Sequence, residues 1–204
     1  MSNFTLPRML RYLVWILLGI LALLIGAWWL ARPISPDSFY NIPTEQGAQA
    51  GTLLRQEAFV HGVPTNAQAW RILYTTTRPD GSAALASAIV MASRTADGGP
   101  RPVIAWTHGT TGISAGCAPS LLGDPFANVP ALSKLIDKGW LYVATDYVGQ
   151  GTPGPHPYLI GEGEARSALD AIRAARQMET IQAGEDTVVW GHSQGGHAAA
   201  FAVE

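Results

Sequence analysis

The stretch TVVWGHSQGGHAAAFAV, residues 187–203, constrains the fold more than any other part of the sequence. An apolar run leads directly into GHSQG, residues 191–195, and a run of small residues follows it. A G-x-S-x-G pentapeptide between a buried strand and a helix forms a tight, strained turn that exposes the serine hydroxyl at the edge of a sheet. Its glycines stand where a side chain would collide with a neighbouring element. The sequence therefore predicts a strand, a sharp turn carrying Ser193 and a helix; a plain Gly-rich turn capped by the serine is the alternative.

The chain after Gly51 alternates between expected strands and helices. The pattern predicts strands at 52–59, 70–77, 83–91, 102–109, 140–146 and 187–190, and helices at 130–138, 161–178 and 197–203. The turn RPDGS joins the second strand to the third, so the first three strands are expected to be antiparallel. The later strands are apolar runs typical of buried parallel strands. This order predicts an α/β fold with a central, mostly parallel sheet, an antiparallel N-terminal part and reactive loops at the carboxyl ends of the strands.

The helix expected at 161–178 is amphipathic. One face carries four residues that would pack on the sheet: Ala165, Leu169, Ile172 and, by its stem, Arg176. Glu162 and Arg166 have the spacing of an i,i+4 ion pair on another face. Glu162 and Glu164 lie in the first turn, where negative charge is favoured.

A long apolar segment near the N-terminus predicts a transmembrane helix. No charged residue occurs from Tyr12 to Ala31, and at about 1.5 Å per residue this segment spans roughly 30 Å, the thickness of the hydrocarbon layer of a bilayer. Two arginines precede it, so residues 1–11 are expected in the cytoplasm. Trp28 and Trp29 suit the interface between lipid and water at its other end.

A cleaved signal peptide, with secretion of the domain, is the alternative for the same segment. Its apolar core would be unusually long, and Trp29 stands where a small residue is wanted before Ala31. A retained signal anchor at 12–31 is therefore preferred, followed by a Pro-rich polar link at 32–51 and by the α/β domain at 52–204. The domain is then expected on the extracytoplasmic side of the membrane.

Composition limits the partners of this chain. The formal net charge is −2 and no cluster of basic residues follows Arg11, so nucleic acid is not an expected partner. Cys117 is the single cysteine, which excludes a disulfide or a CxxC site within these residues. We expect it to be a small buried residue; pairing with a cysteine beyond Glu204 is the alternative in an exported domain. No metal site is expected.

A serine hydroxyl is a weak nucleophile, so it needs a base, an acid that orients the base, and donors for an oxyanion. The amide of Gln194, directly after Ser193 at the start of a helix, is the expected first donor. The second is expected in the loop WTHGTTG, where Gly109 permits close approach of the backbone. The amide of Gly109 or that of Thr110 would point at the oxygen, and a plain turn is the alternative there.

Four pieces of the sequence together resemble the secretory lipase family of the α/β-hydrolase superfamily, the group related to fungal lipase A and its bacterial counterparts. They are HGTTG, CAPS, DYVGQGTPGPHPYLIGEGEARSALDAIRAAR and GHSQGGHAAAFA, in the expected order between Pro102 and the end. The resemblance implies hydrolysis of carboxylic esters, with lipids such as triacylglycerols as substrates and without a cofactor. It also implies the nucleophile at Ser193 and the oxyanion donors at Gln194 and the Gly109/Thr110 turn. The membrane anchor departs from the secreted members.

The base and the acid are not expected among residues 1–204. The superfamily order is serine, acid, histidine, and after Ser193 the chain contains only His197, which a helix would carry away from the turn. His192 is expected to support the turn, His108 to act by backbone and packing, and Asp146 to be structural. A sheet that ended at VVW would expose an apolar edge, so we expect a fragment that lacks roughly half of a domain.

These patterns favour a membrane-anchored serine ester hydrolase that forms an acyl-enzyme on Ser193. Two alternatives stay open. One is acyl transfer or amide cleavage on the same fold, and the other is a tethered binding module that lacks the catalytic triad.

Overall fold

The computed structural model describes residues 6–32, 34–42, 49–95 and 99–203. The chain divides into two compact units, residues 1–33 and 34–204. The first contains α1 (Leu6–Leu30), and part of this helix, Arg8–Leu30, is long and apolar enough to cross a membrane. A signal sequence would have the same properties. Residues 1–5 of the expected cytoplasmic segment lie outside the described residues.

The C-terminal end of α1 carries an aromatic and cationic cluster. The guanidinium of Arg32 lies 3.8 Å from the ring centroid of Trp28 and 4.1 Å from that of Trp29. Both distances are those of cation–π contacts. Indoles and an arginine at one helix end suit the interface between lipid and water, where amphipathic side chains settle.

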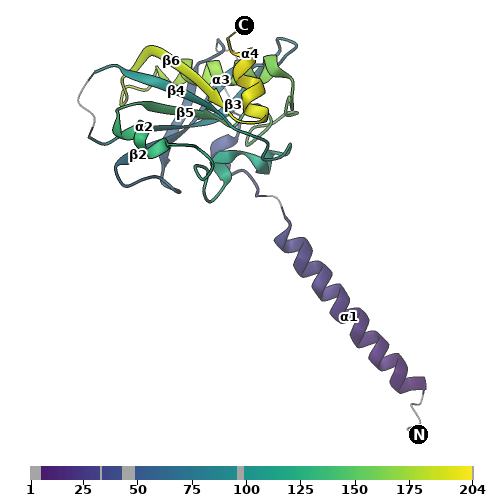
Figure 1. Ribbon diagram of the computed structural model, residues 1–204. Helices are drawn as coiled ribbons and strands as arrows, with labels where there is room; N and C mark the ends of the chain where they lie inside the picture. Colours follow the sequence, from purple (N-terminus) through teal and green to yellow (C-terminus); the bar gives the residue numbers. More distant parts are fainter. Residues whose placement is uncertain (1–5, 33, 43–48, 96–98, 204) are drawn as a thin grey trace. The chain divides into compact units, whose positions relative to one another are not determined.

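The second unit is built on a mixed sheet (Figure 1). Its strands are β1 (Leu53–Phe59), β2 (Ala67–Thr77), β3 (Ala83–Ser93), β4 (Arg101–Thr107), β5 (Leu141–Thr145) and β6 (Ala183–Gly191), in the spatial order β1-β2-β3-β5-β4-β6. β1, β2, β3 and β5 pair antiparallel with one another in turn, whereas β5, β4 and β6 are parallel. The predicted α/β sheet with its antiparallel N-terminal part is confirmed.

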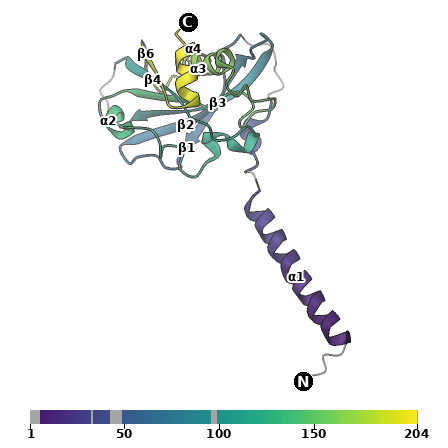
Figure 2. The same ribbon diagram turned by 45° about the vertical axis from the view of Figure 1, so that its right-hand side comes forward.

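Among the described residues, three helices cover the sheet. α3 (Gly161–Ala175) and α4 (Gln194–Phe201) lie side by side on one face (Figure 2), and α2 (Leu132–Asp137) packs on the other. The parallel strands are apolar on both faces for this reason: Val103 and Ala105 belong to the core under α3, whereas Ile104 and Trp106 belong to the core under α2. Short 3-10 turns complete the fold: η1 (Ser38–Tyr40), η2 (Ala115–Cys117) and η3 (Pro119–Leu121).

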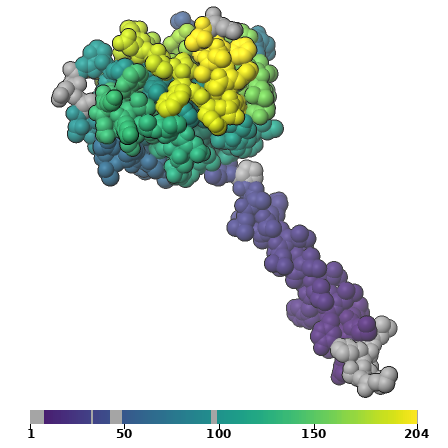
Figure 3. Space-filling view, in the orientation of Figure 1, coloured from purple at the N-terminus to yellow at the C-terminus, as the bar shows by residue number. Residues whose placement is uncertain are grey.

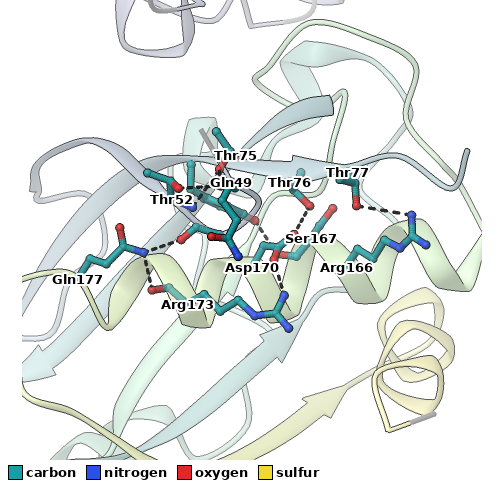
Figure 4. Close-up of polar contacts among 12 residues, drawn as sticks. Gln49, Thr52, Thr75, Thr76, Thr77, Arg166, Ser167, Asp170, Arg173 and Gln177 are labelled. Atoms are coloured by element: carbon teal, nitrogen blue, oxygen red, sulfur yellow. Dashed lines mark hydrogen bonds and ion pairs between the residues drawn. The ribbon is translucent and has the colours of Figure 1, made fainter. Parts of the chain in front are cut away.

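Polar contacts fix α3 against the antiparallel strands (Figure 4). Asp170, almost fully buried, accepts a hydrogen bond of 2.7 Å from the Thr76 hydroxyl and one of 2.5 Å from Arg173. The helix ends at Ala175, earlier than the expected 178, and the Arg176 guanidinium donates to the carbonyl of Gly184 at the start of β6. Arg176 therefore also binds through its polar head, a contact that the sequence did not predict.

Part of the expected link at 32–51 packs against the domain. Asp37 caps η1 by accepting from the Phe39 amide at 2.9 Å, and Arg71 of β2 donates to the same carboxylate at 2.8 Å. Phe39 and Tyr40 are buried, and the Tyr40 hydroxyl lies 2.7 Å from that of Ser120. The structure thus differs from the expectation, because two aromatic side chains and a charge pair hold residues 34–42 in place. Residues 43–48 lie outside the described residues.

β6 stands at one edge of the sheet. Val188 in its middle is 48% exposed, as expected for an apolar strand with no neighbour beyond it in the described sheet. The space-filling view in Figure 3 shows α4 and β6, in yellow and yellow-green, at the surface of the domain.

Candidate active site

Ser193 stands at a sharp turn between a strand and a helix. β6 ends at Gly191 and α4 begins at Gln194, so only two residues join them. Ser193 has φ 57° and ψ −122°, a left-handed conformation that costs a non-glycine residue about 1–3 kcal/mol. Its side chain is exposed. The turn has the strained geometry expected from the sequence, and it places Ser193 at the surface of the domain.

Two glycines make this turn possible. A methyl group added at Gly191 would overlap the Gly195 carbonyl and the Thr107 hydroxyl, and one added at Gly195 would overlap the Thr107 carbonyl. At both positions α4 and the end of β4 are too close for a side chain. The sequence-based explanation of these glycines is therefore correct.

The loop after β4 flanks the serine. A Cβ atom added to Gly109 would lie 3.2 Å from the His192 carbonyl oxygen and 3.6 Å from Cβ of Ser193. Thr110 follows it and is exposed, with its hydroxyl 3.4 Å from that of Tyr158. Gln150, fully buried, holds the loop from behind by donating to the Gly112 carbonyl at 2.6 Å.

This corner suits a developing negative charge. Gln194 is the first residue of α4, so its amide has no acceptor within the helix, and the positive end of the helix dipole lies there. Backbone amides at a helix start bind anions without a metal or a charged side chain. The structure brings Gly109 and Gln194 to the sides of Ser193, with Thr110 next in the loop.

His108 is a packing residue, as expected. Its ring is buried, its Nδ1 lies 2.7 Å from the Gly109 carbonyl oxygen, and its ring centroid is 4.5 Å from that of Tyr147. Burial lowers the pKa of His108 to about 4, although the hydrogen bond to Gly109 opposes this shift. The ring is neutral at pH 7, and Nδ1 carries the proton because a carbonyl can only accept.

The two histidines nearest in sequence to Ser193 lie in different surroundings. His192 is exposed within the turn and faces the Gly109 side. His197 lies on α4, with its ring centroid 4.8 Å from that of Phe201 and its Nδ1 3.4 Å from Oε2 of Glu164. Both placements are those expected of supporting residues.

Asp146 lies in the interior, as expected for a structural acid. Its side chain is fully buried and accepts hydrogen bonds from the Ser87 hydroxyl at 2.6 Å and from the Ser120 amide and hydroxyl at 2.9 and 2.5 Å. Burial raises the pKa of Asp146, while these donors act in the opposite direction.

Cys117 differs from its expectation. It is a free thiol and only half-buried, because it closes the surface turn η2, where Sγ lies 3.1 Å from the Ser114 hydroxyl. No group of three or more His, Cys, Asp or Glu side chains that could hold a metal ion is present in the described ranges.

Sequence reasoning missed the acid that lies beneath the serine. Glu162 forms the expected pair with Arg166, but Glu164 is fully buried and contacts Gln194 and His197 of α4. Its spacing held a signal: Glu164 shares a helical face with Ala168 and Ala171, whose small side chains indicate close contact with another element.

The fold and the strained serine turn define an α/β-hydrolase. The structure is similar to the rice cell wall degrading esterase LipA of Xanthomonas oryzae, with a TM-score of 0.63 and 26% identity over 76% of this chain and 45% of that one. It is also similar to Candida antarctica lipase A in its closed state, with a TM-score of 0.68 and 21% identity over 84% of this chain and 43% of that one. The chain therefore spans less than half the length of these proteins.

Within this fold, residues 127–204 match the model of the secretory lipase family. The resemblance to this family is thus confirmed over its last two pieces, whereas HGTTG and CAPS precede the matched range. No curated protein sequence gives a significant match to the chain.

Proposed function

We propose that this protein is a serine hydrolase of carboxylic esters, of the lipase and esterase kind, acting through an acyl-enzyme on Ser193. The observation that carries the proposal is the exposed serine at φ 57° between β6 and α4, with Gly109 beside it. The match to secretory lipases and the similarity to an esterase support the choice of ester substrates.

The proposed reaction proceeds in two steps. Oγ of Ser193 attacks the ester carbonyl carbon, its proton passes to a base, and the carbonyl oxygen becomes an oxyanion held by the amides of Gln194 and of Gly109 or Thr110. The oxyanion collapses, and the leaving alcohol takes the proton from the base. Water then attacks the acyl-enzyme in the same way and releases the carboxylic acid. One oxyanion donor is worth about 10²–10³ in rate.

We propose that the base and the acid are supplied by polypeptide outside residues 1–204. Three of the nearby rings already have another environment: His108 is buried with a low pKa, and His156 and His197 are engaged with Gln194 and Glu164. The order of the triad in α/β-hydrolases also places the acid and the histidine after the serine.

The proposed location is a membrane, with the α/β unit on the extracytoplasmic side and long-chain acyl esters as substrates. The support is α1, which is long and apolar enough to span a bilayer, with arginines before its apolar part. Protease added outside sealed cells should degrade the α/β unit while it is attached to the membrane. Recovery of the protein only from the medium would favour a cleaved signal peptide.

A fluorophosphonate probe tests the nucleophile. The full-length gene product should be labelled and should hydrolyse p-nitrophenyl esters, and Ser193→Ala should lose both properties. Product analysis with amide substrates and alcohol acceptors separates hydrolysis from amide cleavage and acyl transfer. An unlabelled wild-type protein without hydrolysis would favour a binding module.

A further inference from the structure

A buried carboxylate lies directly behind the residue that follows the proposed nucleophile. Glu164 in the first turn of α3 is 0% exposed. Its Oε1 accepts hydrogen bonds from the Leu159 amide at 3.0 Å and from Nε2 of Gln194 at 2.7 Å. Burying a carboxylate costs free energy, and donors such as these serve to offset that cost. The presence of Glu164 at this buried place therefore needs a reason beyond packing.

The loop before α3 is strained to supply one of these donors. Leu159 has φ 57°, a conformation rarely adopted by a residue with a branched side chain, and its amide points at Oε1 of Glu164. Strain of this kind persists only where the surrounding contacts determine it. Glu164 is thus held by the loop directly before its own helix, in addition to its contacts with α4.

Gln194 is held from two sides. One N–H of its side-chain amide donates to Glu164, and the other donates to Nε2 of His156 at 3.1 Å. Nδ1 of His156 lies 3.1 Å from the Val148 carbonyl oxygen, which can only accept, so the proton is on Nδ1 and Nε2 is free to accept. Burial lowers the pKa of His156, which favours the neutral ring that can accept from Gln194.

A second contact joins the acid to the same helix. Oε2 of Glu164 lies 3.4 Å from Nδ1 of His197, one helical turn beyond Ser193. The carboxylate therefore contacts α4 at its first residue and at its fourth, the first of which directly follows Ser193.

We propose that Glu164 is a positioning residue that orients the main-chain amide of Gln194 toward the oxyanion. Its link to the Gln194 side chain fixes the backbone of the first residue of α4, and its contact with His197 fixes the direction of the helix. This inference rests on the proposed ester hydrolysis. It adds a requirement for an acid that does not touch the substrate.

Steady-state hydrolysis of a soluble p-nitrophenyl ester by the full-length enzyme tests this role. Glu164→Gln should lower kcat about ten- to hundred-fold and leave KM nearly unchanged, because a misaligned oxyanion donor is felt in the transition state. Gln194→Met keeps the volume and the main-chain amide but removes the side-chain donors, and it should cause a similar loss. The double variant should lose little more than either single variant, because both break the same link.

Asp170→Asn is the matched control. Asp170 lies on the same helix and is as buried as Glu164, but it binds Thr76 and Arg173, away from the serine turn. This variant should lower the melting temperature and leave kcat unchanged.

Wild-type kcat in folded Glu164→Gln would overturn the positioning role. If Glu164→Gln does not fold, Gln194→Met decides the matter, and wild-type kcat in that variant overturns the role equally. Failure of the proposed function gives a different result, since the wild-type enzyme would then be inactive and unlabelled by the fluorophosphonate.

Discussion

The hydroxyl of Thr107 donates a hydrogen bond of 2.8 Å to the carbonyl oxygen of Gly195. This bond joins the last residue of β4 to the first turn of α4, so the loop with Gly109 and the turn with Ser193 meet at one corner. The contact is so close that position 195 has no room for a Cβ atom.

Gly195→Ala should therefore disrupt the corner. The added methyl group would overlap the Thr107 carbonyl and lie 2.8 Å from that of His108, and backbone atoms cannot move aside cheaply. We expect a loss of stability of about 3 kcal/mol or more and loss of fluorophosphonate labelling. Gly196→Ala is the control, because its nearest contact would be an ordinary 3.6 Å, and it should fold and be labelled. Equal melting temperatures for the two variants would contradict this account.

The backbone strain at Ser193 should be measurable as a difference in the free energy of unfolding between two variants. Replacement by glycine relieves the left-handed conformation, whereas replacement by alanine does not. Ser193→Gly should therefore be more stable than Ser193→Ala by about 1 kcal/mol, although both are inactive. Ala200→Gly, in the exposed part of α4, should have the opposite sign and lose about 1 kcal/mol. Chemical denaturation of the detergent-solubilised variants checks both values, and a less stable Ser193→Gly would refute the strain.

Burial of His108 predicts acid sensitivity. Its pKa falls from 6.5 to about 4 on folding, so below pH 6.5 the unfolded state binds a proton that the folded state refuses. The contribution of His108 to the free energy of unfolding is complete above pH 6.5. It is lost as the pH falls to about 4, and the total loss is roughly 3 kcal/mol.

The matched variant for this prediction is His108→Asn, which does not titrate. Its stability should fall less steeply than that of the wild type between pH 6.5 and 4. The comparison removes the contribution of Asp146, whose raised pKa acts in the opposite direction and is common to both proteins. Parallel curves of unfolding free energy against pH would show that the pKa of His108 does not change on folding.

Arg71 should hold the segment before β1 in place. It donates to Asp37 at 2.8 Å and to Glu57 at 2.5 Å, and its guanidinium lies 4.3 Å from the Phe39 ring centroid. In Arg71→Ala, chymotrypsin should cleave after Phe39 or Tyr40 much faster than in the wild type, because these side chains lose the cover that buries them. Arg94→Ala, at an exposed position, should behave as the wild type. Unchanged cleavage in Arg71→Ala would mean that the aromatic contacts suffice.

The sequence predicted the sheet and the serine turn well because their signals are local. Each parallel strand is an apolar run bounded by glycine or a polar residue, and GHSQG forces a sharp turn through its own glycines. β5 was expected at 140–146 and lies at Leu141–Thr145, a difference confined to the ends. The antiparallel order of the first three strands followed from the turn RPDGS between two of them.

The partners of Glu164 and of residues 34–42 could not be predicted in this way. Glu164 binds Gln194, thirty positions away, and the Tyr40 hydroxyl meets Ser120, eighty positions away. Hydrogen bonds between such distant residues produce no periodic pattern in the sequence. Their partners are therefore known only from the tertiary structure. By itself the sequence determined an apolar N-terminal helix, an α/β sheet and a serine on a strained turn, because short-range sterics and hydrophobic pattern fix these. The tertiary structure alone decided which buried acid stands behind that turn, because α3 and α4 meet only when the sheet is formed.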